Sequence, residues 1–277
     1  MSIQLASHSA TRYLQPLREG GSLPAVVDTE AGMFVTKFRG AGQGVKALVA
    51  ELLAALLARA LDLPVPETVL IDVSPIFGRT ERDPEIQELL RRSHGTNLGM
   101  RYLDGAFNFD PYAAGSLIDP ELAAGTVWFD AFLTNPDRTA RNPNILIWQR
   151  QPWLIDHGAA IYAHHDWRGT DEARARTAFP LIKHHVLLAQ AGDIEAADAR
   201  LAPRITSDLV DEAVAALPDE LLRDPTRPEE PEPPELRDRY RAWLMTRAAG
   251  PREFVAEAVR AKRDRRDEPP QRRRARR

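Results

Sequence analysis

The feature that most constrains this chain is a pair of short apolar runs, flanked by acids and amides, between residues 129 and 162. Residues 144–148 and 153–156 are predicted to be two strands joined by a loop at residues 149–152. Folding this hairpin about its loop lays Asp156 roughly opposite the first residues of the first strand, Asn144 or Ile145. The chain is therefore expected to be organised around a hairpin with polar side chains at its open end.

Three side chains in this stretch have identities that suit one kind of chemistry: Asp137, Asn142 and Asp156. Asn142 precedes the residues opposite Asp156 by two or three positions, a span of roughly 7 to 10 Å that two inward-leaning side chains can close onto one cation. Oxygen ligands from one Asn and one Asp, with room for water and phosphate, suit Mg²⁺. Asp137 lies in the loop before the hairpin, where it can meet an incoming hydroxyl group. A metal clamp and a carboxylate at the nucleophile are what phosphoryl transfer requires.

Composition favours an ordered protein in a reducing compartment. The chain has 277 residues, of which 43% are hydrophobic and 28% charged, and its net charge of −3 is too small to indicate nucleic acid or a membrane as the main partner. It has no cysteine, which excludes disulfides and thiolate metal sites. The N-terminus lacks the apolar core of a signal peptide, and the longest apolar run, residues 47–58, is too short to span a membrane. We therefore expect a soluble, cytoplasmic protein.

The first hundred residues are predicted to be rich in strands, at residues 25–27, 33–38, 67–73 and 98–103, with one strong helix at 44–61. A glycine turn precedes the first of these strands. The adjacent residues Gly20 and Gly21 in this turn could let backbone N–H groups approach a phosphate, although paired glycines are also ordinary hairpin chemistry.

Lys37 and Glu51 stand out because each lies in apolar surroundings. On the strand at 33–38, alternation puts Lys37 on the same face as Met33 and Val35, and such a lysine usually extends its amine to water. Glu51 is the only polar residue between Ala47 and Ala58, in a helix that is apolar nearly all round and therefore covered. A covered carboxylate needs a cationic partner or shifts its pKa, and Lys37 is a candidate partner. The alternative is that Glu51 reaches solvent at the margin of the apolar face.

The second half is predicted to be mostly helical. Asp119-Pro120 is a good helix start, and Asn135-Pro136 ends this helix before Asp137. Further helices are expected at residues 178–188, 194–201, 206–217 and 236–261, with a Pro- and Glu-rich linker at 224–235. The last sixteen residues, 262–277, contain nine Lys or Arg against three Asp or Glu and are expected to form a disordered tail. Its charge could attract nucleic acid or acidic partners, and a merely solvated tail explains it as well.

The segments NPDRTARN and WLIDHG resemble the catalytic and metal-binding segments of HipA-type kinases, bacterial relatives of the protein-kinase fold. The resemblance covers roughly residues 15–220. It implies an α+β, two-lobed protein-kinase-like fold, with a strand-rich N-lobe at 1–102, a mostly helical C-lobe at 103–261 and the basic tail at 262–277. It also implies the use of ATP and Mg²⁺.

The resemblance implies a role for each residue of the two segments. Asp137 would be the catalytic carboxylate that orients the acceptor hydroxyl and receives its proton, and Asn142 and Asp156 would hold Mg²⁺. Lys37 would bind the α- and β-phosphates, with Glu51 holding Lys37.

The resemblance also predicts two nucleotide-binding segments. The glycine turn would cover the phosphates through Gly20, Gly21 and Ser22. The crossing between the lobes would lie beside the adenine through Met100, Arg101 and Tyr102. One departure from ordinary protein kinases is His157, which stands where the common motif has Phe.

The leading hypothesis is a kinase that transfers the γ-phosphoryl group of ATP to a Ser or Thr hydroxyl of a protein. The same acid–Asn–acid pattern leaves open a lipid or small-molecule kinase, or a nucleotide-binding pseudokinase that regulates a partner. Two histidine pairs, at 164–165 and 184–185, are expected to be surface residues and not metal ligands, because adjacent side chains diverge and no third ligand is suitably spaced.

Overall fold

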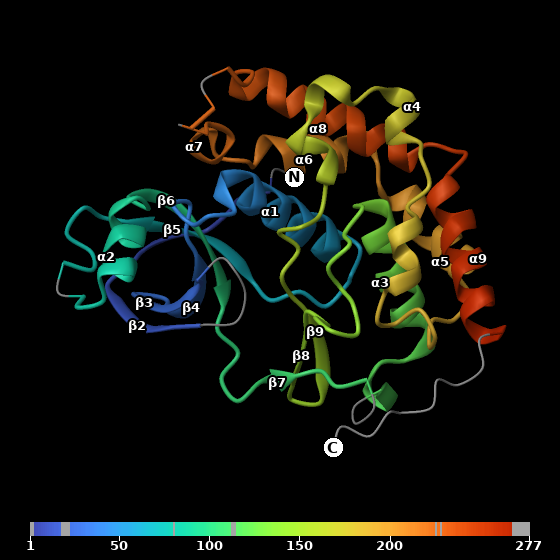
Figure 1. The fold of residues 1–277 in the computed structure, drawn as a ribbon, viewed down its shortest axis with the longest axis horizontal. Coiled ribbons are helices and arrows are strands. Elements are labelled where there is room, and N and C mark those ends of the chain that lie inside the picture. The colour runs from blue at the N-terminus through green and yellow to red at the C-terminus, as the bar shows by residue number, and fades with distance from the viewer. Residues whose placement is uncertain are drawn as a thin grey trace.

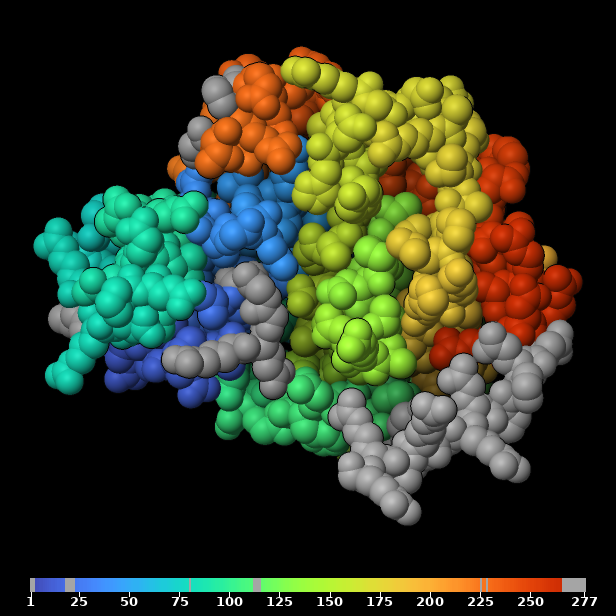
Figure 2. All heavy atoms as spheres, in the orientation of Figure 1, coloured from blue at the N-terminus to red at the C-terminus, as the bar shows by residue number. Residues whose placement is uncertain are grey.

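The computed structural model describes residues 3–17, 23–79, 81–111, 115–224, 226–227 and 229–267. It has an α+β fold with a strand-rich part built mostly from the first hundred residues and a larger helical part built from the rest (Figure 1). Figure 2 shows the two parts as neighbouring masses, blue to cyan and green to red. This is the two-lobed, kinase-like fold class that the sequence predicted. None of the described helices combines the length and hydrophobicity needed to cross a bilayer.

The strand-rich part is a six-stranded sheet in the order β1-β5-β6-β4-β3-β2. Its strands are β1 Ser7–Ser9, β2 Arg12–Pro16, β3 Ala25–Thr29, β4 Gly32–Lys37, β5 Thr68–Val73 and β6 Gly95–Arg101. Every neighbouring pair is antiparallel except β1 and β5. Along β4 and just beyond it, Phe34, Thr36 and Phe38 are buried on one face, whereas Lys37 lies on the other, as alternation predicted.

Helix α1 (Gly44–Ala60) lies between the sheet and the remaining helices (Figure 1). All its residues from Val45 to Ala58 are buried, because it packs against β6 on one side and against α6 (Ser207–Ala215) and α7 (Asp219–Leu222) on another. Its side chains belong to the large core of the helical part. A lobe boundary at 102/103 therefore remains a prediction, since one core draws on both sides of it.

A smaller core fills the opposite face of the sheet. There α2 (Pro84–Arg91) brings Ile86, Leu89 and Leu90 against Phe34 and Phe38. Asp83 starts this helix by accepting a hydrogen bond from the backbone N–H of Glu85 at 2.9 Å. The sheet thus has helices on both faces, with α2 on the side away from the helical part (Figure 1).

The helical part is built on α3 (Pro120–Phe132), which begins as predicted. The Asp119 carboxylate accepts from the backbone N–H of Leu122 at 2.8 Å, and Pro120 occupies the first turn. The remaining helices are α4 Glu172–Ala175, α5 Ile194–Leu201, α8 Pro233–Ala248 and α9 Glu253–Asp267. Helices α5 and α9 both pack on α3 (Figure 1).

Three predictions about this part are wrong. Residues 178–188 hold only a short 3₁₀ turn, Pro180–His184, because Pro180 and the bends around it stop a regular helix. Helix α8 begins at Pro233, inside the predicted linker, since Pro is favourable in a first helical turn. Helix α9 continues to Asp267, so the basic segment begins as part of a helix. The buried face of this helix includes Ala258 and Ala261, just before the basic segment. Residues 268–277 lie outside the described residues.

The predicted hairpin is present as β8 (Ile145–Trp148) and β9 (Gln151–Leu154), with β7 (Phe107–Asn108) on the other side of β8. Its loop has two residues and not four. Gln149 and Arg150 both have positive φ, 49° and 63°, the conformation of the tight turns that match strand twist. Pro152 is tolerated inside β9 because β9 is an edge strand. Ile145 pairs with Leu154, so Asp156 lies beyond its predicted position opposite Asn144 or Ile145.

Candidate active site

A cavity of about 880 Å³ lies between the sheet and the hairpin. Its lining includes Val35, Lys37, Leu98 and Met100 from the sheet, Glu51 from α1, and Asp137, Asn142, Leu146, Ile155 and Asp156 from the loop and the hairpin. The sheet contributes mainly apolar side chains, and the charged side chains come from α1, the end of β4 and the two segments around the hairpin. This volume suits a ligand the size of a nucleotide.

Lys37 joins the sheet to α1 and to the hairpin. Its Nζ lies 2.6 Å from Glu51 Oε2 and 2.5 Å from Asp156 Oδ1. Burial disfavours the charged form of Lys37, but attraction to Glu51 and Asp156 outweighs it and raises the pKa above 10.5. Burial also opposes the charge on Glu51, yet attraction to Lys37 and the nearby imidazole of His157 hold its pKa at about 2. Lys37 therefore holds two acids that are 105 residues apart in the sequence.

His157 lies beside this ion pair, on its buried side. Its side chain is 2% exposed, its Nδ1 lies 3.8 Å from Glu51 Oε1, and its ring packs edge-on against Phe129. The phenyl ring of ordinary protein kinases at this position cannot donate a hydrogen bond, whereas His157 can. Gly158 follows, and a Cβ there would meet Ala47 and Glu51 only at ordinary contact distances.

Asp137 lies in the loop after α3, half-buried at the cavity. Its Oδ2 accepts from Asn142 Nδ2 at 2.9 Å and from Asn144 Nδ2 at 3.3 Å. Asn144 and Asp156 both have left-handed backbone conformations, with φ of 50° and 54°, where the chain enters and leaves the hairpin. These turns take both residues out of the regular strand, and the Asn144 side chain reaches Asp137 whereas that of Asp156 reaches Lys37.

Arg138 connects this loop to the hairpin through buried hydrogen bonds. Its side chain is fully buried: Nε donates to Asp130 Oδ2 at 2.6 Å, and one terminal nitrogen donates to the backbone carbonyls of Asn144 and Ile155. Asp130 also accepts from Asn135 Nδ2 and contacts His185 Nε2, each at 2.9 Å. Burial would raise the pKa of Asp130, but Arg138 and His185 lower it well below its usual range. Arg138, the residue after Asp137, thus ties the loop to the backbone carbonyls of Asn144 and Ile155 at the open end of the hairpin.

Sequence reasoning missed this buried network. The signal for Asp130 was the same as for Glu51, because Asp130 is a lone acid in a helical run, Ala123 to Phe132, that is buried throughout. Arg138 could have been proposed as the cationic partner of Asp130, because it lies close in the sequence and next to Asp137. His185 was expected at the surface, and so was His164; both are buried, and the prediction is wrong for these two because each has a hydrogen-bond partner, Asp130 or Tyr240.

The two predicted nucleotide-binding segments have different outcomes. Met100 lines the cavity, but Arg101 and Tyr102 do not. The Arg101 guanidinium is held away from it by Glu67, at 2.6 Å, and by the Phe34 ring, and the Tyr102 backbone N–H donates to Met33. Gly20, Gly21 and Ser22 lie outside the described residues, although Leu17 and Pro24 on either side of that stretch line the cavity.

The polar end of the cavity offers oxygen ligands without a complete metal cage. Asn142 uses its amide nitrogen towards Asp137, which leaves its amide oxygen available, and Asp156 uses only Oδ1 towards Lys37. Within the described ranges, no cluster of three or more His, Cys, Asp or Glu side chains could hold a metal ion alone. One amide and one carboxylate suit a hard cation that takes its remaining ligands from phosphate and water.

Comparisons with known proteins agree with this geometry. The crystal structure of the Helicobacter pylori proinflammatory kinase CtkA is similar, with a TM-score of 0.53 and 11% sequence identity, over 96% of this chain and 100% of that chain. At this identity the likeness shows a shared fold. A comparison with curated proteins found no significant match. A family model described as a HipA-like kinase matches residues 13–221, most of the chain. This protein therefore belongs to the family of HipA-like kinases.

Proposed function

We propose that this kinase uses ATP and Mg²⁺ to phosphorylate a Ser or Thr hydroxyl of a protein. The observation that carries the proposal is the convergence of Lys37, Glu51, Asp137, Asn142 and Asp156 at one end of a single cavity. These five identities are the charged and polar groups that phosphoryl transfer needs. None of them is replaced by an inert side chain, which favours an enzyme over a pseudokinase scaffold.

In the proposed reaction, each residue acts on a stated atom. Lys37, kept protonated by Glu51, donates hydrogen bonds to phosphate oxygens of ATP. Asp137 accepts a hydrogen bond from the acceptor hydroxyl, orients its oxygen towards the γ-phosphorus and receives its proton as the new P–O bond forms and the bond to the leaving ADP oxygen breaks. Asn142 and Asp156 would hold Mg²⁺, which when bound neutralises charge on the phosphates.

The test is transfer of labelled γ-phosphate by the purified protein, alone and with cell lysate, in the wild type and in two variants. Asp137→Ala should lower transfer by about 10²- to 10⁴-fold while ATP binding is kept, because it removes the base and no phosphate contact. Asp156→Ala should instead weaken Mg²⁺-dependent nucleotide binding. Asp72→Ala, an exposed acid on β5, is the matched control and should match the wild type.

The possible results separate the proposal from its competitors. An equal loss of ATP binding in Asp137→Ala and Asp156→Ala would contradict the division of roles. Label found only in lipids or small molecules would favour a kinase with a different acceptor. ATP binding without any transfer would identify a pseudokinase.

A further inference from the structure

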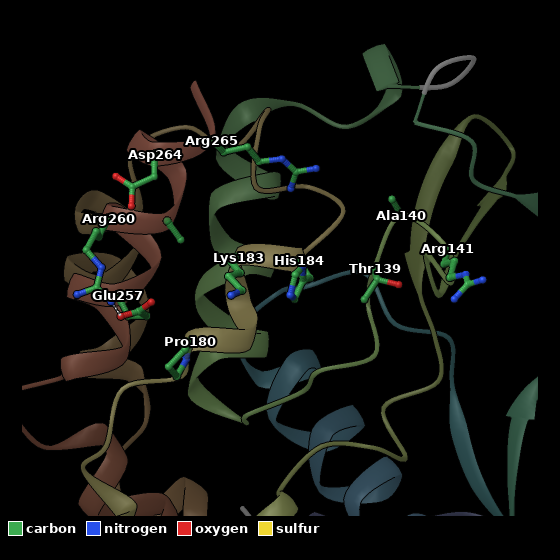
Figure 3. Close-up of a pocket in the computed structure, with 11 residues that line it drawn as sticks. Thr139, Ala140, Arg141, Pro180, Lys183, His184, Glu257, Arg260, Asp264 and Arg265 are labelled. Carbon is green, nitrogen blue, oxygen red and sulfur yellow. Dashed lines mark hydrogen bonds and ion pairs between the residues drawn. The ribbon is translucent and has the colours of Figure 1, made fainter. Parts of the chain in front are cut away.

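A second cavity, also of about 880 Å³, lies on the helical part beside the loop that carries Asp137. Its walls are the loop residues Thr139–Arg141, the 3₁₀ turn Pro180–His184 and one face of α9 (Figure 3). We call it the loop groove. The sequence analysis assigned nothing to it, and none of the five proposed catalytic and metal-binding side chains lines it.

The loop groove is continuous with the candidate active site through one residue. Arg141 lines both cavities, and it lies four positions after Asp137 and next to Asn142. The wall between them is firmly built: the Thr139 N–H donates to the Asn142 carbonyl at 2.9 Å, and the Val186 N–H donates to the Arg138 carbonyl at 3.0 Å. A chain lying in the loop groove would therefore reach Asp137 at one end.

Some of the positively charged side chains in the loop groove have partners in the protein and others do not. On α9, Arg260 forms an ion pair with Glu257, and Arg265 donates to the His185 carbonyl at 2.9 Å. Arg141 and Lys183, at the end nearest the loop, are exposed and form no ion pair with any residue the structure describes. Figure 3 shows Lys183 and His184 between α9 and the loop, and Arg141 on the loop itself. The groove therefore presents net positive charge beside the site of transfer.

We infer that the loop groove binds an acidic segment of the polypeptide acceptor, with Arg141 and Lys183 pairing with its carboxylates while its hydroxyl lies at Asp137. This inference rests on the proposed protein-kinase function and adds the class of acceptor. Nucleic acid is the competing anionic occupant. It is disfavoured because the lining contains no Trp, Tyr or Phe on which bases could stack.

The test measures binding directly, so that it does not depend on catalysis. Fluorescence anisotropy of three labelled peptides, each with one Ser flanked by Glu, by Gln or by Lys, gives their affinities for the full-length protein. The Glu peptide should bind about tenfold more tightly than the Gln peptide, since each exposed ion pair contributes up to about fivefold. This preference should disappear as salt rises from about 0.05 to about 0.5 M.

Charge reversal distinguishes the groove from general electrostatic attraction. Lys183→Glu should weaken binding of the Glu peptide by about tenfold and strengthen that of the Lys peptide, because it replaces attraction by repulsion. Arg150→Glu makes the same charge change at the exposed β8–β9 turn, outside both cavities, and should match the wild type. Nucleotide binding by each variant checks folding, and Lys183→Gln replaces Lys183→Glu if that variant is unfolded.

Each outcome decides the inference. Equal affinity for the three peptides, or equal losses in Lys183→Glu and Arg150→Glu, would overturn it while leaving the proposed function intact wherever labelled phosphate is still transferred. A single-stranded oligonucleotide that binds more tightly than the Glu peptide and is lost in Lys183→Glu would assign the groove to nucleic acid. Failure of phosphate transfer to every acceptor, with the peptide preference kept, would refute the kinase proposal and the acceptor role of the bound peptide, and would leave the loop groove as a binding site for acidic peptides.

Discussion

At the scale of single residues, the protein depends on one half-buried lysine between two acids. Lys37 is 16% exposed and Glu51 9%, so neither charge could be kept there alone. Asp156, at 43%, is the open side of the arrangement and faces the cavity. The pair with Glu51 thus serves stability, and the pair with Asp156 keeps in place the side chain proposed to bind the metal ion.

The free energy of unfolding should report the Glu51 charge through its pH dependence. The pKa of Glu51 falls from 4.5 to about 2 on folding, so its stabilisation is present above pH 4.5 and is lost as the pH falls towards 2. Glu51→Gln should lower stability by about 3 kcal/mol at pH 7. That difference should shrink by about 2 kcal/mol at pH 3, because the wild type is then losing the same charge.

Urea denaturation of both proteins at pH 7, 5 and 3 measures this difference. Asp130, whose pKa is also lowered, titrates in both proteins and cancels. Lys37 has a raised pKa, so its contribution is constant below pH 10.5 and does not enter this range. If the difference in unfolding free energy between the two proteins is the same at pH 7 and pH 3, then pairing with Lys37 does not lower the pKa of Glu51.

The sequence was informative where chemistry and spacing coincide in one segment. Asp137, Asn142 and Asp156 could be found because a short hairpin forces them together. Glu51 could be found because a helix without a polar face must cover it. Arg101 and Tyr102 were assigned to the cavity because the chain crosses between the lobes near them. The acid that turns Arg101 away is Glu67, just before β5 and 34 residues away in the sequence, so it gave no local signal. His185, 55 residues from its partner Asp130, gave no local signal.

At the scale of elements, the loop after α3 is held by two buried arginines, one at its start and one within it. At its start, Arg247 from α8 is 2% exposed and donates to the carbonyls of Ala131 and Phe132 at 2.8 and 2.6 Å, and its burial lowers its pKa to about 10. It satisfies carbonyls that the end of a helix leaves unpaired. Within the loop, Arg138 connects Asp130 of α3 to the backbone carbonyls of Asn144 and Ile155, which flank the two strands of the hairpin.

Arg138 is expected to position the active site without touching substrate. Arg138→Met should lower stability by about 3–5 kcal/mol, because it leaves Asp130 buried without its cation. It should also lower kcat by about 10²-fold with little change in KM for ATP, since the carbonyls of Asn144 and Ile155 lose their donor and the loop shifts.

The double variant Asp130→Leu with Arg138→Met separates these two effects. Replacing both charges by apolar groups should recover much of the stability, because no buried charge is left unpaired. The value of kcat should stay low, because the carbonyls of Asn144 and Ile155 still lack their hydrogen-bond donor. Recovery of kcat together with stability, measured by denaturation and steady-state kinetics, would mean that Arg138 has only a structural role.

At the scale of the whole molecule, α1 is shared by the two parts. Its buried residues belong to the core of the helical part, yet it bears the acid that pairs with a lysine of the sheet. Lys46 anchors its first turn: its Nζ lies 2.5 Å from Glu230 and 2.7 Å from the His164 carbonyl. The segment around Glu230, predicted to be a linker, is thus packed against α1.

Hydrogen exchange should show this as a rigid helix. Amides of α1 should be among the slowest to exchange in the protein without nucleotide, because the helix is buried on all sides. Addition of ATP analogue and Mg²⁺ should increase protection around Leu17, Pro24 and the loop at Asp137, and change α1 little. Rapid exchange of α1 that slows only when nucleotide is added would contradict this expectation.

The full burial of α1 bears on how such an enzyme can be controlled. Many kinases are switched off by swinging the helix that carries the glutamate away from its lysine. Here that movement would pull fourteen consecutive residues, Val45 to Ala58, out of the interior and would cost a large part of the folding energy. We therefore expect a kinase that is active whenever it is folded, so that a cell holding it would have to limit its synthesis, its lifetime or its access to the acceptor.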